Sequence, residues 1–156
     1  MYGDAGNDSF SGNEGDDVIY GGADNDTVRG GNDDDRIYGD AGIDTLYGDG
    51  GNDVIAGDDN DDTIYGGTGN DNLGGRLGND VIYGESGNDS LTGNEGDDTL
   101  YGGNGADTMR GVQGADKFDG DDPDGGQYDA PGDSNGDGDT DVITDFTSQD
   151  TRTDVP

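Results

Sequence analysis

An aspartate recurs every nine residues through the first three quarters of this 156-residue chain. The chain contains no histidine and no cysteine, so these carboxylates work neither beside the commonest general base nor beside a thiolate metal ligand. Calcium, a hard cation that takes about six to eight oxygen ligands, is the natural partner of regularly spaced carboxylates. The candidate metal ligands are Asp8, Asp17, Asp26, Asp35, Asp44, Asp53, Asp62, Asp71, Asp80, Asp89, Asp98, Asp107 and Asp116.

Each of these aspartates sits at position six of a nine-residue unit that begins with glycine. The thirteen glycines run in constant phase from Gly3 to Gly111, and one apolar residue occupies position eight of every unit, from Phe10 to Phe118. An internal repeat of this length indicates stacked structural units. A merely acidic tail has no reason to keep a carboxylate and an apolar side chain in register.

The composition restricts how such a chain can fold and what it can bind. Only 25% of the residues are hydrophobic and the formal net charge is −33, a combination typical of disorder. With six basic residues the chain is a poor ligand for nucleic acid or anionic lipid. No apolar run is long enough for a membrane-spanning helix. Cations remain as the expected partners, and order is expected to depend on them.

The unit predicts alternating turns and strands. Position four is glycine except at Asp24, Asp33 and Asn60, the residue types that best tolerate left-handed backbone angles, so we expect a positive φ there. Six residues of turn should lead into a three-residue strand such as residues 63–65, with the apolar residue pointing inward.

Two units form an eighteen-residue coil, and stacked coils can pair their strands in parallel. The predicted fold is all-β: a parallel β-roll, or right-handed β-helix, over residues 1–119. Its core is expected to be two facing ladders, one of Phe10, Val28, Leu46, Ile64, Ile82, Leu100 and Phe118, the other of Ile19, Ile37, Ile55, Leu73, Leu91 and Met109.

The segments GGTGNDNLG (66–74) and GGNGADTMR (102–110) resemble the repeat G-G-x-G-x-D-x-U-x of the RTX (repeats-in-toxin, hemolysin-type) calcium-binding family. The resemblance implies that turns of repeats n and n+2 share a calcium ion through backbone carbonyls and the position-six aspartate. Up to about eleven ions would then fit in the array. It also implies a module of a larger bacterial protein that is secreted, by the type I route, and folds outside the cell.

Calcium is expected to drive the folding. Thirteen apolar side chains bury too little surface to offset the entropy of ordering this array. Unscreened carboxylates stacked between coils repel one another as well. Folding should therefore wait for the ion, and magnesium, which requires a strict octahedron, should serve less well.

The two ends depart from the repeat. Tyr2 and Gly3 enter it in mid-phase, so we expect Met1 to be an added start on a piece of a longer array, although a natural start is an alternative. Residues 120–156 are expected to form an acidic connecting loop and a cap, with residues 141–146 as the capping strand and residues 147–156 frayed. Residues 133–141 resemble the beginning of an EF-hand loop, which leaves a further calcium site or a plain acidic loop open at Asp133, Asn135, Asp137 and Asp139.

No catalytic constellation is visible, since the repeated carboxylates are committed to ions, and we expect no enzymatic activity. An alternative role lies on the outward strand positions of one face, where tyrosine and threonine recur every eighteen residues. Strand propensity explains them, but a regular surface for ice, a glycan or a neighbouring domain is the competing interpretation. The candidate surface residues are Tyr47, Tyr65, Tyr83, Tyr101, Thr45, Thr63 and Thr99, with Val81 in the same row.

Overall fold

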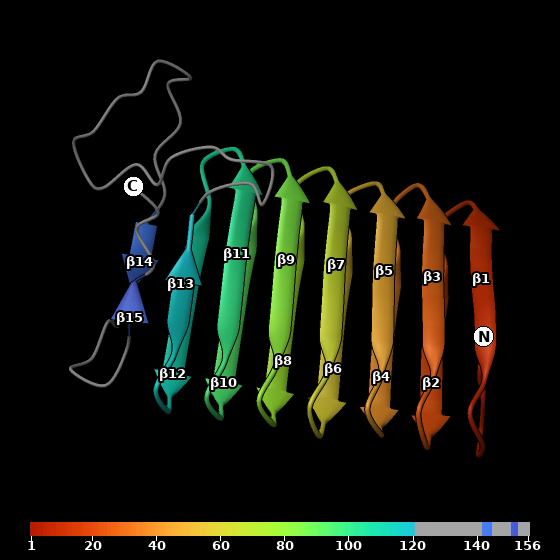
Figure 1. Ribbon diagram of the computed structural model, residues 1–156. Coiled ribbons are helices and arrows are strands. Elements are labelled where there is room, and N and C mark those ends of the chain that lie inside the picture. Colours follow the sequence, from red (N-terminus) through yellow and green to blue (C-terminus); the bar gives the residue numbers. More distant parts are fainter. Residues whose placement is uncertain (121–141, 145–150, 153–156) are drawn as a thin grey trace.

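A computed structural model describes residues 1–120, 142–144 and 151–152. The described residues contain strands and turns and no helix, and therefore no helix that could span a membrane. Figure 1 shows the strands stacked side by side in sequence order along one axis. Their bounds are β1 (Ser9–Glu14), β2 (Val18–Ala23), β3 (Thr27–Asn32), β4 (Arg36–Ala41), β5 (Thr45–Gly50), β6 (Val54–Asp59), β7 (Thr63–Thr68), β8 (Asn72–Leu77), β9 (Val81–Ser86), β10 (Ser90–Glu95), β11 (Thr99–Asn104), β12 (Thr108–Gln113), β13 (Lys117–Asp119), β14 (Val142–Thr144) and β15 (Thr151–Arg152).

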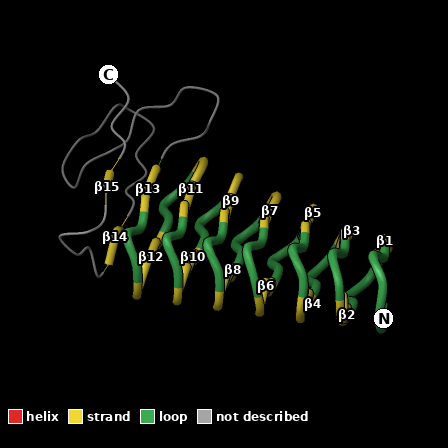
Figure 2. The backbone as a smooth tube through the Cα atoms, turned by 60° about the horizontal axis from the view of Figure 1, so that its bottom comes forward, coloured by secondary structure: helices red, strands yellow, loops and turns green. Residues whose placement is uncertain are grey.

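Odd-numbered and even-numbered strands form two separate parallel sheets. The odd sheet has eight strands in the order β1-β3-β5-β7-β9-β11-β13-β15, and the even sheet has seven in the order β14-β12-β10-β8-β6-β4-β2. Within the repeats each residue pairs with the one eighteen positions later, as Ile64 does with Ile82. The tube in Figure 2 passes from one sheet to the other and back in every coil. The predicted all-β parallel solenoid with eighteen-residue coils is confirmed.

The strands are longer than the sequence indicated. Each strand of the array from β1 to β12 has six residues, because it continues from positions seven to nine into positions one to three of the next unit. In β7 the buried residues include Ile64 and Gly66, which alternate with the half-buried Thr63 and Tyr65. Gly66 thus continues the inward face of the strand. The prediction of a three-residue strand was wrong because it took the leading glycine as a turn residue.

The core is the expected pair of ladders between the two sheets. From Ile19 to Phe118 every position-eight side chain is at most 2% exposed, and together these side chains form one cluster. Phe10, in the first coil, is only partly buried against it. The interior is therefore one apolar layer per coil, and each layer depends on its neighbours.

Two positions of every unit adopt positive φ. At position four this includes the non-glycine residues Asp24, Asp33 and Asn60, so the expectation of left-handed geometry there is confirmed. Position two does the same and was not anticipated, since it holds varied residues that include Arg76 and Val112. Stacking of the coils evidently imposes this conformation even on a β-branched side chain, which ordinarily avoids it.

Two short strands beyond the repeats extend the sheets. β14 pairs with β12, placing Ile143 opposite Met109, and β15 pairs with β13, placing Thr151 opposite Lys117. Residues 151–152 were expected to be frayed, and that expectation is wrong because they add a strand to the odd sheet. The assignment of residues 141–146 as a cap over the last core layer stays a prediction.

Candidate metal centres

The position-six aspartates lie immediately before the strands, in two columns at the opposite turn edges of the coil. Asp8 and Asp17 in the first coil are half-buried. From Asp26 onward the exposed fraction is at most 3%. The structure therefore places a buried carboxylate in each turn, which is costly unless the charge is compensated. The buried members are Asp26, Asp35, Asp44, Asp53, Asp62, Asp71, Asp80, Asp89, Asp98, Asp107 and Asp116.

One oxygen of each carboxylate joins successive coils. The backbone N–H of Asp44 donates to Oδ1 of Asp62 at 2.8 Å, and the N–H of Asp62 donates to Oδ1 of Asp80 at 2.8 Å. The same bond recurs along both columns, always between residues eighteen apart. Every aspartate thereby fixes the register between its own coil and the preceding coil.

The other oxygen lacks such a partner. In the part of the chain that the structure describes, Oδ2 of each aspartate from Asp26 to Asp98 is buried and accepts no hydrogen bond. This oxygen lies against the glycine at position one: a Cβ added to Gly48 would lie 2.3 Å from Oδ2 of Asp53 and 2.4 Å from the carbonyl oxygen of Gly66. A carboxylate oxygen and a backbone carbonyl oxygen thus share a space that only glycine leaves open.

Burial opposes the charge that these carboxylates would carry. It raises the pKa of Asp62 to about 8, against the lowering effect of the hydrogen bond from Asp44 and with further raising by neighbouring aspartates. The same causes, led by burial, raise the pKa of Asp98 to about 7 and that of Asp53 to about 6. A raised pKa means that the fold disfavours the ionised carboxylate, and a bound cation would reverse this penalty.

Carboxylates alone do not complete a metal site. Among the described residues, no three or more acidic side chains gather closely enough to hold an ion. Each turn instead combines one carboxylate with backbone carbonyls, including those exposed by glycine at positive φ. Such an all-oxygen, mainly neutral donor set fits calcium, so the residues present are compatible with the ion predicted from the sequence.

A second side-chain ladder follows position five, which sequence reasoning had left without a role. The N–H of Asn70 donates to Oδ1 of Asn52 at 2.9 Å, and the N–H of Asn88 donates to Oδ1 of Asn70 at 2.8 Å. These bonds run in the opposite direction to those of position six, so each turn is bound to its neighbours both ways. The signal was present in the sequence, because position five is asparagine or aspartate in every unit except those of Ile43, Ala106 and Ala115.

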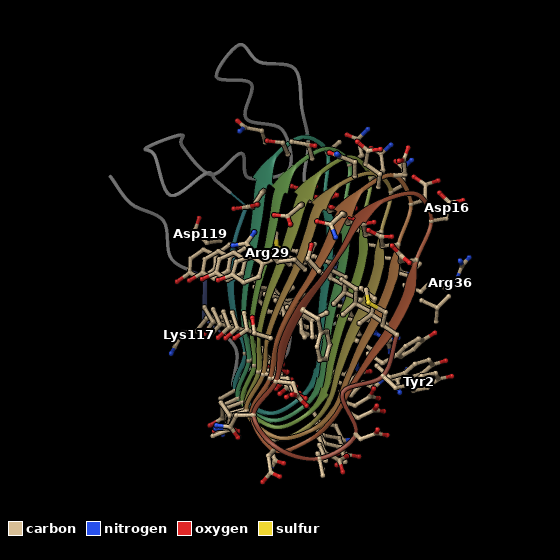
Figure 3. The ribbon with its side chains drawn as sticks, turned by 90° about the vertical axis from the view of Figure 1, so that its right-hand side faces the viewer. Tyr2, Asp16, Arg29, Arg36, Lys117 and Asp119 are labelled. Carbon is tan, nitrogen blue, oxygen red and sulfur yellow. The ribbon has the colours of Figure 1, made fainter. Side chains whose placement is uncertain are left out.

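The tyrosines form stacks on the outside of both sheets. On the odd sheet, Tyr47, Tyr65, Tyr83 and Tyr101 have neighbouring ring centroids 4.7 to 4.9 Å apart. The position-seven residues Thr45, Thr63, Val81 and Thr99 form a parallel row beside them. Figure 3 also shows Tyr2 on the opposite side of the solenoid, where it begins a shorter stack with Tyr20 and Tyr38. The longer ladder therefore lies on the odd sheet alone.

Four candidate calcium ligands, Asp133, Asn135, Asp137 and Asp139, lie outside the described residues. The hypothesis of a separate site there stays a prediction.

Buried carboxylates repeated between parallel coils define a calcium-binding β-solenoid. Comparison with family models agrees, since the model of the RTX calcium-binding nonapeptide repeat (4 copies) matches residues 2–37, 29–63, 38–73, 74–109 and 83–118. The chain belongs to this RTX calcium-binding repeat family. A search of curated proteins gives no match. The protein is thus a calcium-binding repeat module of a kind that is generally structural.

Proposed function

We propose that this module folds when calcium binds, after secretion, and thereby serves as a structural part of a larger extracellular protein. The observation that carries the proposal is the row of buried Oδ2 atoms without hydrogen-bond partners, from Asp26 to Asp98 among the described residues. A protein interior that contains such oxygens is incomplete without a cation. The raised pKa of Asp62 has the same cause and supports the same conclusion.

The proposed ligands are the thirteen position-six aspartates together with carbonyl oxygens of their turns. Each ion would join the turns of repeats n and n+2, which gives up to about eleven ions in the array. When bound, calcium supplies positive charge to carboxylates that otherwise repel one another between coils. The aspartates provide the register bonds through Oδ1 and leave Oδ2 for the ion. No enzymatic role is proposed for them.

Secretion by a bacterial type I system fits the same mechanism. The low calcium concentration inside a cell would keep the chain extended, and the higher concentration outside would fold it. The proposed domain organisation is a β-roll over residues 1–119, followed by an acidic connecting loop and cap over residues 120–156. The strand pairs of β14 and β15 with the end of the array support a capping role for the second part.

A second candidate function is binding at the tyrosine and threonine face of the odd sheet. The specific observation in its favour is a groove of about 320 Å³ beside the ladder, with Tyr83 and Tyr101 in its lining. The face exists only in the stacked coils, so this role would depend on the same calcium-induced fold.

Circular dichroism in the far ultraviolet tests the main proposal. In chelator we expect the spectrum of a disordered chain, and on titration with calcium a steep change to β-structure, because neighbouring coils share each site. The midpoint should lie at about 10⁻⁴ to 10⁻³ M, the range of extracellular calcium modules. Magnesium at equal concentration should have much less effect. A β-spectrum already present in chelator would contradict calcium-dependent folding.

A further inference from the structure

A groove runs along the outer face of the odd sheet, between the tyrosine ladder and the turn edge; we call it the tyrosine groove. Its main part holds about 320 Å³ and is lined by Asp49, Gly67, Tyr83, Glu85 and Tyr101 together with smaller residues. A second hollow of about 420 Å³ follows toward the first coil and is lined by residues that include Asn13, Gly31 and Asp49. Asp49 therefore stands between two parts of one channel.

The floor of the tyrosine groove alternates between polar side chains and glycines. Position two of successive odd strands is Asn13, Gly31, Asp49, Gly67, Glu85 and Gly103, all in register. The glycines keep the hollows open, and a Cβ on Gly67 would lie 2.2 Å from the carbonyl oxygen of Asp49. Because adjacent strands lie about 4.8 Å apart, the carboxylates of Asp49 and Glu85 recur at about 9.6 Å along the groove.

One of these carboxylates already holds a guanidinium from the chain itself. Nη1 of Arg29 lies 2.7 Å from Oδ1 of Asp49, and its Cζ lies 4.0 Å from the ring centroid of Tyr47. Figure 3 shows Arg29 at the near end of the row of stacked rings. The pair is about half exposed, so it is a surface contact. It shows which group the combination of carboxylate and tyrosine accommodates.

The ladder is less suited to the other ligands considered for this face. Glycans commonly stack on aromatic ring faces, but within the ladder each face is covered by the next ring at 4.7 to 4.9 Å. What remains accessible is ring edges and hydroxyls beside carboxylates. An ice plane requires a flat surface, whereas this face is hollowed over its glycines. A cationic group entering a hollow meets compatible chemistry instead.

We propose that the tyrosine groove binds an extended partner peptide that carries arginine at every third residue. A polyproline II segment repeats every three residues at about 9.3 Å, close to the spacing of about 9.6 Å between Asp49 and Glu85. Tyrosine-lined grooves suit this conformation because it costs little entropy to order. Charge complementarity is strong, since the chain carries −33. Arg29 occupies the Asp49 position and competes with the partner there. The inference specifies the ligand of the second candidate function and rests on the calcium-induced fold.

Fluorescence anisotropy with a synthetic peptide tests the assignment, at saturating calcium and about 0.15 M salt. The probe is a labelled peptide of three consecutive Arg-Pro-Pro units, compared with a peptide of the same composition in which three arginines precede six prolines. The variants are Glu85→Gln in the groove, Arg29→Gln beside it, and Glu95→Gln as the matched control on the exposed edge of the even sheet. Circular dichroism of every sample reports the calcium-dependent fold separately.

The expected results are specific to each variant. Glu85→Gln should weaken binding of the Arg-Pro-Pro peptide about three- to fivefold, the size expected for an exposed charge pair. Arg29→Gln should strengthen it by a similar factor, because Asp49 is released, and Glu95→Gln should leave it unchanged. The peptide with clustered arginines should bind more weakly. Equal binding of both peptides, equal effects of Glu85→Gln and Glu95→Gln, or no binding to a folded array would each overturn the groove assignment while leaving calcium-dependent folding intact.

Discussion

The first and seventh repeats contain the same residues at the key positions and yet lie in different surroundings. Asp62 of the seventh repeat is 1% exposed, accepts from the coil before it and donates to the coil after it. Asp8 of the first repeat is half-buried and is bonded through its N–H to Asp26 of the following coil. A repeat therefore does not carry its own stability. Its neighbours confer it, as expected of a one-dimensional stack in which each unit contacts only adjacent units.

The sharpest test of this difference compares Asp62→Ala with Asp8→Ala. The central change removes the acceptor of a buried N–H, at a cost of about 1–3 kcal/mol, and removes a ligand from two proposed ions. The end change affects one proposed ion and a coil that can fray. Asp62→Ala should raise the calcium midpoint and reduce the steepness of the titration clearly more, as measured by circular dichroism.

Equal shifts for the two variants would contradict a stacked array. They would mean that the ions bind independently along a flexible acidic chain.

The next largest difference concerns the core. Leu46→Ala empties part of a fully buried layer and should lower the unfolding free energy of the calcium-loaded protein by about 2–5 kcal/mol. Phe10→Ala should cost less, although phenylalanine is larger, because Phe10 is only partly buried against the cluster. Denaturant unfolding at fixed calcium concentration measures both. A larger loss from Phe10→Ala would show that the first coil is as well covered as the centre.

Much of this architecture could be predicted from one sequence because the repeat states it thirteen times. A nine-residue phase fixes which side chains share a ladder, and so the coil, the core and the columns of aspartates followed directly. The strand length could not be read in the same way. Gly66 has the composition of a turn, and only the stacked coils show that it continues the buried face of β7 next to Ile64.

Interactions between coils were the least predictable. The positive φ of Val112 contradicts its local preference, and it is imposed by the coils on either side. The two oxygens of Asp53 likewise have identical chemistry in the sequence. Only packing separates them, because Oδ1 meets the N–H of Asp35 while Oδ2 faces Gly48. The resemblance to RTX repeats indicated which residues bind calcium, and the structure adds which oxygen of each carboxylate is left for the ion.

The smallest expected difference lies in the position-five ladder on the turns. Asn70→Ala removes the acceptor for the N–H of Asn88 and the side-chain donor toward Asn52, whereas Asn7→Ala removes the acceptor for the N–H of Asn25 in the first coil. These groups are exposed, so water replaces part of each bond, and the central change should cost only about 0.5–1.5 kcal/mol. The end change should cost less, because the first coil contributes least to the cooperative unit. Denaturant midpoints at saturating calcium measure both, with Asp62→Ala as the reference for a change at the adjacent position. If Asn70→Ala were as damaging as Asp62→Ala, the two opposed ladders would contribute equally to the array. Hydrogen bonding between turns, rather than the buried carboxylate, would then explain why the coils stay in register.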